Sequence, residues 1–353
     1  MVEFRKEFET AEPYKIASRA TYNLGDNENR LIDWSFLAEE TLKSLQTSEL
    51  TFYGDNRYAE LLTAYATYAK VKPEQVTVGV GSDFLIHMII TTFLKNDDVF
   101  LTVNPDFFMY QVYNTMHGSQ FERVDLDWEK GSLSLSADKV LAHAQTVGAK
   151  VIMLSNPNNP SSVAHDPQEL EKIIANFSGL VVIDEAYIEF AACPSFVEKI
   201  NDYDNLIVLR TLSKAFGLAG VRLGFALANE GLIYEIDKVI PPYSLSNLAA
   251  RMGTVALGYT EQVLACIEDI KELRQDFLAF LETLPEVQVL PSQASFVTFT
   301  APWAAQLHQE AISNGWNFKY YTEGRLTNYI RMSMGRPEEM EKMKSRIRKL
   351  VEG

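Results

Sequence analysis

Lys214 is the residue of this chain whose surroundings point most directly to chemistry. It lies in residues 210–222 (RTLSKAFGLAGVR), where most neighbours are small or apolar and a second cation, Arg222, follows eight residues later. A lysine resists burial unless its charge is removed or used, and an apolar site near another cation favours the neutral amine that attacks a carbonyl. The pattern predicts a lysine that forms a Schiff base beside an arginine that binds phosphate.

Two polar segments follow other apolar runs of the chain. Asp184 closes the run Val181-Val182-Ile183, Tyr187 stands three residues later, and Asn159 follows the run 151–155. A carboxylate at the end of such a run is expected to be buried and to need a cationic or hydrogen-bonded partner, for which a protonated pyridine nitrogen is suited. Without the other motifs, each of these residues has a structural interpretation. Asp184 would be a helix cap or part of a structural ion pair, Tyr187 a packing residue and Asn159 a turn residue.

A third segment has the features of an anion pocket. Residues 79–84 (GVGSDF) follow a strand-like run and open a helical pattern, so backbone amides and the Ser82 hydroxyl can face an anion at a helix N-terminus. The third glycine of a dinucleotide-binding fingerprint is replaced by Phe84, which argues against a Rossmann domain and a nicotinamide-dependent dehydrogenase. Thr211, Ser213 and Arg222 supply two hydroxyls and a bidentate guanidinium for the same group.

The elements that must position these residues are short apolar runs at 76–80, 99–103, 151–155, 181–184, 206–210 and 223–227. Helical patterns such as 84–94 and 167–175 separate them, which is typical of strands buried on both faces of a mostly parallel sheet. A long helical pattern over 245–284 is followed by strand-like runs at 287–290, 296–299, 317–321 and 329–333, and a last helix opens at Arg336-Pro337. The sequence therefore predicts an α/β three-layer sandwich plus a smaller C-terminal α+β domain.

We predict three regions from these patterns. Residues 1–35 form an N-terminal arm that packs on the small domain or on a partner protomer, residues 36–245 the large domain, and residues 246–353 the small domain. Ligands of open parallel sheets bind outside the carboxyl ends of the strands. Asn159, Asp184 and Lys214 all follow such ends, so one crevice can collect them.

Composition excludes several other classes of protein. The 353 residues carry a net charge of −15, which argues against a nucleic-acid surface and favours small-molecule partners. The N-terminus lacks the apolar core of a signal peptide, and no apolar run is long enough to span a membrane. The two cysteines, Cys193 and Cys266, provide no disulfide framework, and the five histidines have no metal-ligand spacing. We expect a cytoplasmic protein without a metal site.

Taken together, residues 155–160 (SNPNNP), 181–187 (VVIDEAY) and 210–222 resemble the pyridoxal-phosphate site of fold-type I aminotransferases, and most closely the histidinol-phosphate aminotransferase family. The resemblance extends over nearly the whole chain, from 25–29 (GDNEN) to 329–335 (YIRMSMG). It implies pyridoxal 5′-phosphate as cofactor and Lys214, Asp184 and Tyr187 as catalytic residues. It implies these cofactor-binding residues: Gly81, Ser82, Asp83, Tyr110, Asn159, Asp184, Tyr187, Thr211, Ser213, Lys214, Arg222 and Tyr53.

In this resemblance Tyr110 stacks on the cofactor ring, and Tyr53 reaches the phosphate of the neighbouring protomer, which implies a homodimer. Arg331 resembles the arginine that binds the substrate carboxylate or, for histidinol phosphate, its phosphate. Asn27, Tyr22 and Lys319 complete the substrate-binding candidates, and Trp34, Tyr22 and Phe107 are aromatic candidates for the pocket. Three positions depart from the family pattern: Lys319 where an arginine is common, Ser295 where an asparagine is usual, and Ser161-Ser162 in place of Thr-Gly.

The leading functional hypothesis is transfer of the amino group of L-histidinol phosphate to 2-oxoglutarate, giving imidazole acetol phosphate and L-glutamate in histidine biosynthesis. Two alternatives use the same scaffold: an aminotransferase for aromatic amino acids, and a decarboxylase of threonine phosphate. A protein of another class, one that binds or regulates and has lost catalysis, is disfavoured by the presence of Lys214, Asp184, Tyr187, Asn159 and Arg222.

Overall fold

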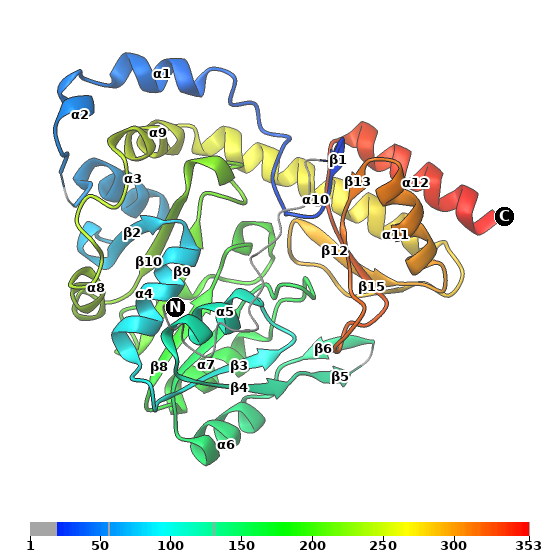
Figure 1. Ribbon diagram of the computed structural model, residues 1–353, viewed down its shortest axis with the longest axis horizontal. Coiled ribbons are helices and arrows are strands. Elements are labelled where there is room, and N and C mark those ends of the chain that lie inside the picture. Colours follow the sequence, from blue (N-terminus) through cyan, green and yellow to red (C-terminus); the bar gives the residue numbers. More distant parts are fainter. Residues whose placement is uncertain (1–19, 56, 130, 353) are drawn as a thin grey trace, which may run out of the picture.

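The computed structural model describes residues 20–55, 57–129 and 131–352. A seven-stranded sheet in the order β2-β10-β9-β8-β7-β3-β4 forms its centre (Figure 1). β10 runs antiparallel to β9 and β2, and the other neighbouring strands are parallel, which confirms the predicted mostly parallel sheet. The strands are β2 (Val76–Val80), β3 (Val99–Asn104), β4 (Gln120–Asp125), β7 (Ala149–Ser155), β8 (Leu180–Asp184), β9 (Leu206–Thr211) and β10 (Leu223–Leu227).

Helices cover both faces of this sheet and make it the middle of three layers (Figure 1). Successive residues of a strand point to opposite faces, so Val182 packs into one core while Val181 and Ile183 pack into the other. α4 (Ser82–Phe93), α5 (Met109–His117) and α8 (Glu230–Asp237) lie on the Val182 side. α3 (Ala59–Ala69), α6 (Ala137–Val147), α7 (Pro167–Asn176) and α9 (Asn247–Leu257) lie on the other. The three-layer prediction is confirmed.

A second, antiparallel sheet in the order β11-β12-β15-β14 forms the smaller α+β part that the sequence predicts. The long helix α10 leads into it from the central sheet, and α11 and α12 pack beside it (Figure 1). Its elements are α10 (Thr260–Glu282), β11 (Gln288–Val289), β12 (Phe296–Thr300), α11 (Ala304–Ser313), β13 (Trp316–Asn317), β14 (Lys319–Tyr320), β15 (Tyr329–Ser333) and α12 (Pro337–Glu352).

The predicted N-terminal arm is described only from residue 20 onward, because residues 1–19 lie outside the described residues. Within it, β1 (Tyr22–Asn23) pairs in parallel with β13. α9 packs against α1 (Leu37–Ser44) and α3, although it follows the predicted domain boundary at residue 245. The division into 1–35, 36–245 and 246–353 stays a prediction.

The structure differs from the expected elements in three places. β4 is an edge strand with a mostly polar sequence, so it lacks the continuous apolar run that marks the buried strands. The helical pattern over 245–284 is two helices, because α9 ends at Leu257 and α10 starts at Thr260, with Gly258 and Tyr259 between them. The expected strand at 317–321 is split between β13 and β14. The remaining elements are α2 (Ser48–Thr51), β5 (Asp127–Glu129), β6 (Ser132–Ser134) and the 3₁₀ turns η2 (Pro73–Gln75), η3 (Ile188–Phe190), η4 (Phe196–Lys199) and η5 (Ala219–Val221).

Candidate active site

A cavity of about 600 Å³ opens at the carboxyl ends of β7, β8 and β9, where ligands of parallel sheets bind. It collects most of the predicted site residues, from segments that lie far apart in the sequence. They are Asn27, Ser82, Asp83, Asn159, Asp184, Tyr187, Thr211, Ser213, Lys214, Arg222, Lys319 and Arg331. Gly81, Tyr110, Tyr53 and Tyr22 do not line it.

Asp184 is a buried carboxylate at the last residue of β8, on the face of the sheet that carries Val182. The Tyr110 hydroxyl donates to its Oδ2 over 2.9 Å, and the Ala186 amide donates to its Oδ1 over 3.1 Å. Burial raises the pKa of Asp184 to about 6, although these two hydrogen bonds act in the opposite direction. No cation among the described residues pairs with it, so a cationic N–H group in the cavity would complete its environment.

Tyr110 lies behind the cavity wall rather than in it. Its ring is fully buried in the core of the Val182 side, and its hydroxyl is held by Asp184. Two other aromatic residues, Phe107 and Phe108, lie just before α5 and line the cavity. The ring-stacking role expected for Tyr110 stays a prediction, and Phe107, three residues earlier in the chain, is the aromatic candidate that lines the cavity. Tyr110 orients the carboxylate of Asp184.

Lys214 follows the end of β9 and lies in a turn that two backbone hydrogen bonds stabilise. The Leu218 amide donates to the Leu212 carbonyl over 3.0 Å, and the Gly217 amide donates to the Lys214 carbonyl over 3.1 Å. The amine of Lys214 enters the cavity and donates to the backbone carbonyl of Asp26 over 3.0 Å. No described carboxylate pairs with this amine, so it is held by a neutral acceptor that a ligand can replace.

The Tyr187 hydroxyl is fixed by the N-terminal segment of the chain. Asn27 Nδ2 donates to Tyr187 Oη over 2.9 Å, and the Ser333 hydroxyl of β15 donates to Asn27 Oδ1 over 2.8 Å. The backbone amide of Asn27 donates to the Ser333 hydroxyl oxygen over 3.0 Å. Because Tyr187 Oη accepts from Asn27, its own hydrogen remains available for a bond into the cavity.

Arg331 and Lys319 bring two cations into the cavity from the small sheet. They are opposite residues of the antiparallel pair β14–β15, and neither forms an ion pair with a described carboxylate. Arg331 Nη1 donates to Asn159 Oδ1 over 2.6 Å, and its Nη2 donates to the Gly25 carbonyl over 2.5 Å. The Arg331 Nε is buried without a partner. Two cations without an acidic partner among the described residues favour an anionic group in this part of the cavity.

The residues predicted to form an anion pocket, 79–84, lead into the start of α4, and Ser82 and Asp83 line the cavity. Ser82 is the first residue of that helix, whose N-terminal amides have no side-chain cap. Arg222 lies beside it, with Nη2 3.4 Å from Asp83 Oδ2, and the Thr211 and Ser213 side chains line the same cavity. Gly81 has φ +83° and ψ 162°, and a Cβ there would overlap Arg222 Nη2. Gly81 thus contributes by the absence of a side chain.

Replacing Gly81 with alanine is expected to weaken binding at this pocket about tenfold. The backbone conformation of Gly81 is nearly exclusive to glycine and costs another residue about 1–3 kcal/mol, and the new Cβ displaces the Arg222 guanidinium. Isothermal titration with inorganic phosphate and with the cofactor measures the change. Gly148→Ala is the matched control, because Gly148 also has positive φ but has open space around its Cβ position. Equal affinity losses in both variants would contradict the role of Gly81.

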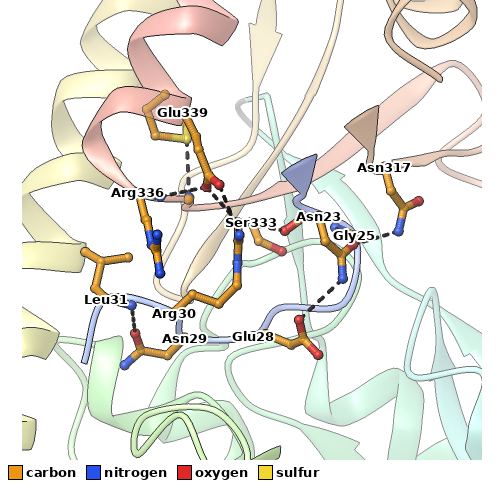
Figure 2. A network of polar contacts seen from close by, with 12 residues as sticks. Asn23, Gly25, Glu28, Asn29, Arg30, Leu31, Asn317, Ser333, Arg336 and Glu339 are labelled. Carbon is orange, nitrogen blue, oxygen red and sulfur yellow. Dashed lines mark hydrogen bonds and ion pairs between the residues drawn. The ribbon is translucent and has the colours of Figure 1, made fainter. Parts of the chain in front are cut away.

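The segment that carries Asp26 and Asn27 is tied to the small sheet and the last helix (Figure 2). Arg30 forms a two-point ion pair with Glu339 of α12, with Nη1–Oε1 at 3.0 Å and Nη2–Oε2 at 2.7 Å. Glu339 Oε2 also accepts from the Arg336 amide at the start of that helix, over 2.9 Å. At the other end of the segment, Asn317 Nδ2 donates to Asn23 Oδ1 over 2.7 Å. One wall of the cavity is thus built by the N-terminal segment.

Three further candidates lie away from the cavity of their own chain. Tyr22 stacks on Trp316 at 4.1 Å between ring centres, its hydroxyl accepts from Lys342, and it does not line the cavity, so its expected substrate contact stays a prediction. Tyr53 is 82% exposed and stacks on Tyr243. Trp34, the other aromatic candidate, donates its ring N–H to the Phe216 carbonyl outside the cavity lining.

Several residues at the site were not predicted from the sequence. Asp26, Met109, Ser155 and Tyr321 also line the cavity. Asp106 lies just behind it, where it accepts hydrogen bonds from Ser155 and, over 3.0 Å, from Thr102. Burial raises the pKa of Asp106 to about 7. The available signal was its position: Asp106 comes two residues after the end of β3, and Asp184 is the last residue of β8, so both carboxylates stand at the end of a buried apolar strand.

Comparison with known proteins agrees with this geometry. The family model described as aminotransferase class I and II matches residues 20–347. A histidinol-phosphate aminotransferase of Clostridium kluyveri is 32% identical over 350 residues, which cover 99% of this chain and 98% of the relative.

Two solved structures share the fold. A histidinol-phosphate aminotransferase from Sinorhizobium meliloti, in complex with pyridoxal-5′-phosphate, superposes with a TM-score of 0.88 at 20% identity, covering 100% of this chain and 98% of the other. An L-threonine-O-3-phosphate decarboxylase from Porphyromonas gingivalis superposes with a TM-score of 0.79 at 19% identity, covering 94% and 100%.

The chain therefore belongs to the class I and II aminotransferase family, and the protein is an aminotransferase. Among its relatives, those named histidinol-phosphate aminotransferase match over nearly their full length, which confirms the resemblance stated from the sequence.

Proposed function

We propose that this protein is a pyridoxal-phosphate-dependent aminotransferase that transfers the amino group of L-histidinol phosphate to 2-oxoglutarate, in histidine biosynthesis. The observation that supports the substrate class is the pair Lys319 and Arg331, two cations that line the cavity from the neighbouring strands β14 and β15. Neither forms an ion pair with a carboxylate among the described residues. They suit the phosphate of one substrate and a carboxylate of the other. The full-length relatives named histidinol-phosphate aminotransferase support this choice.

The residues of the cavity fit the cofactor. Asp184 is buried, and no cation among the described residues pairs with it, which suits a protonated pyridine nitrogen as its partner. The start of α4, with Arg222, Ser213 and Thr211, offers amides, a guanidinium and hydroxyls for a phosphate. Pyridoxal phosphate supplies an electron-accepting ring that stabilises the negative charge left when the α-proton of an amino acid is removed. Asp184 would keep the ring nitrogen protonated and so maintain that capacity.

Lys214 has the central role in the chemistry. Its amine lies in the same cavity as the candidate cofactor contacts and bonds only to the neutral Asp26 carbonyl among the described residues. In its neutral form this amine is the nucleophile that can hold the aldehyde of the cofactor, and when released it can move a proton at the α-carbon of the substrate. Lys214 is therefore both the attachment point and the general acid–base.

Tyr187 and Asn159 tune the other side of the cavity. Asn27 fixes the Tyr187 oxygen, so the hydroxyl hydrogen points to a ligand, and Arg331 occupies Asn159 Oδ1, so its Nδ2 remains as a donor. Both donors can stabilise a negatively charged phenolic oxygen of the cofactor. Phe107 supplies an aromatic wall to the same cavity.

The substrate assignment is tested by a half-reaction without an oxo acid. L-histidinol phosphate is expected to convert the bound cofactor to its amine form, seen as loss of its visible band, faster than L-phenylalanine, L-tyrosine or threonine phosphate. Arg331→Ala should raise KM for histidinol phosphate about 100-fold and Lys319→Ala about tenfold, since hydrogen bonds to charged groups contribute about 1.5–3 kcal/mol. Preference for an aromatic amino acid, or release of carbon dioxide from threonine phosphate, would reassign the substrate.

The assembly we propose is a cytoplasmic homodimer. Tyr53 is highly exposed and lies away from the cavity of its own chain, beside the exposed side chains of Leu50 and Phe52. This exposure supports a role at the phosphate of a second copy. Both cysteines are unpaired, which suits a reducing compartment. In the described part of the chain, no helix is long and apolar enough to cross a membrane.

A further inference from the structure

Behind the cavity, a buried ionic cluster joins the turn after β8 to the end of β9. Arg210 Nε lies 2.9 Å from Glu185 Oε2, and its Nη1 lies 3.0 Å from Glu189 Oε1. Its Nη2 donates to the Ser195 hydroxyl over 2.7 Å, and that hydroxyl donates to Glu185 Oε2 over 2.6 Å. Tyr68 donates its hydroxyl to Glu189 over 3.2 Å. The guanidinium thus directs all three of its nitrogens to partners.

This cluster lies on the opposite face of the sheet from the cofactor contacts. Successive residues at the end of β8 point to opposite faces, so Asp184 lies on the Val182 side and Glu185 on the other. Along β9, Thr211 lies on the Val182 side and Arg210 on the same side as Glu185. Each charged member of the cluster is next to, or two residues from, a cavity residue. Glu185 adjoins Asp184, Glu189 follows Tyr187 by two residues, and Arg210 adjoins Thr211.

We propose that Arg210, with Glu185 and Glu189, positions the cofactor-binding residues from behind: it holds the turn that carries Asp184 and Tyr187 against the strand that leads to Lys214, and it neutralises the carboxylate next to Asp184. The inference rests on the proposed use of Asp184 to hold the cofactor ring. Arg210 does not line the cavity, so we assign it a positioning role.

The charges of the cluster act on Asp184 through its nearest neighbour. Burial is the main cause of the raised pKa of Asp184, and the charge of Glu185 adds to it. The pKa of Glu185 itself is raised by burial and lowered by Arg210. Without the guanidinium, Glu185 and Glu189 would be buried without a cation, and their repulsion would disfavour the ionised form of Asp184. A less ionised Asp184 would hold a protonated ring nitrogen more weakly.

Four variants of the holoenzyme test this inference. Arg210→Met removes the charge at similar length, Arg210→Met with Glu185→Gln removes both charges, and Arg210→Lys keeps the cation. Lys344→Met is the matched control, because Lys344 is also a buried cation, with Asp276 and Glu341 as partners in the small part of the molecule. For each, the measurements are cofactor affinity, the pH midpoint of the visible cofactor band, kcat and KM, and the Tm of the apoprotein.

Arg210→Met is expected to weaken cofactor binding about tenfold, the effect of one pKa unit on Asp184, and to raise the pH midpoint of the visible band. The double variant should recover most of both changes, since it also removes the carboxylate next to Asp184. Lys344→Met should lower Tm and leave the cofactor measurements unchanged. Arg210→Lys should keep the midpoint, and it decides the question if Arg210→Met does not fold.

The inference is overturned if Arg210→Met resembles Lys344→Met, or if the double variant binds cofactor no better than the single one. It is also overturned if folded Arg210→Lys loses cofactor affinity more than tenfold. Failure of the unaltered protein to bind pyridoxal phosphate is a different result, because it would reject the proposed function itself.

Discussion

Replacing Lys214 with alanine is expected to abolish transamination, with kcat reduced about 10⁴-fold or more. A positioned general acid–base contributes about 10²- to 10⁴-fold, and this variant also loses the nucleophile. The amine donates to the Asp26 carbonyl and lies 5.8 Å from the centre of the Tyr187 ring, and neither partner is charged, so the substitution leaves no buried charge unpaired and the fold is expected to persist. Product formation and the visible band of the cofactor measure the change.

Lys319→Ala is the control for this variant, because it removes a lysine from the same cavity. It should retain the visible band of the covalently held cofactor and most of kcat. Retention of that band and of turnover by Lys214→Ala would show that the lysine has been assigned wrongly.

Asp184→Asn is expected to lower kcat about 10³-fold and at the same time to stabilise the apoprotein. The activity falls because a neutral amide cannot hold a protonated ring nitrogen, and a charge placed to stabilise a transition state contributes about 10²- to 10³-fold. The fold gains because an ionised carboxylate in a buried site costs free energy. Asparagine can still accept from the Ala186 amide and donate to the Tyr110 hydroxyl.

The pH dependence of this gain follows from the raised pKa of Asp184. Its pKa is about 6 in the fold and 3.8 in the unfolded reference, so the folded state binds this proton more tightly. Between pH 3.8 and about 6 the unfolded state releases the proton first, and stability is lost as pH rises. Above about pH 6 the loss is complete and amounts to about 3 kcal/mol.

Asparagine does not titrate, so the difference in unfolding free energy between Asp184→Asn and the unaltered apoprotein should be small near pH 4 and largest above about pH 6. Asp106, which also has a raised pKa, is present in both proteins and cancels in the difference. Urea unfolding at several pH values measures it. A difference that does not change with pH would mean that Asp184 is not a titrating buried group, whatever the variant does to activity.

The sequence placed some residues correctly because each stands in a short segment at a strand end. Asp184 closes β8, Thr211 closes β9 and Lys214 follows it, and the carboxyl ends of parallel strands meet at one edge of the sheet. Continuous apolar runs identify such strands. The fold class, and the edge of the sheet at which the site residues meet, could therefore both be predicted from the sequence. The exposed edge strand β4 was missed because its sequence lacks that run.

The choice between Phe107 and Tyr110 depended on how the first turn of α5 meets the sheet. Both are aromatic and only three residues apart, so composition does not distinguish them. In the fold, Phe107 lines the cavity while Tyr110 reaches Asp184 from behind. Tyr22 shows the same limit, because its pairing in β1 with β13 directs it to Trp316 and away from the cavity.

The sequence by itself determined the class of chemistry, since a lysine, an aspartate and a phosphate-type loop each occupy a local segment that strands and helices position in a predictable way. Only the tertiary structure decided what holds these groups. Asn27 meets Tyr187, Arg331 meets Asn159, and Arg210 meets Glu185 and Glu189 across at least 21 residues and up to 172. Such contacts depend on strand order and on the side to which each residue points, and no local pattern encodes the pairing of one segment with another.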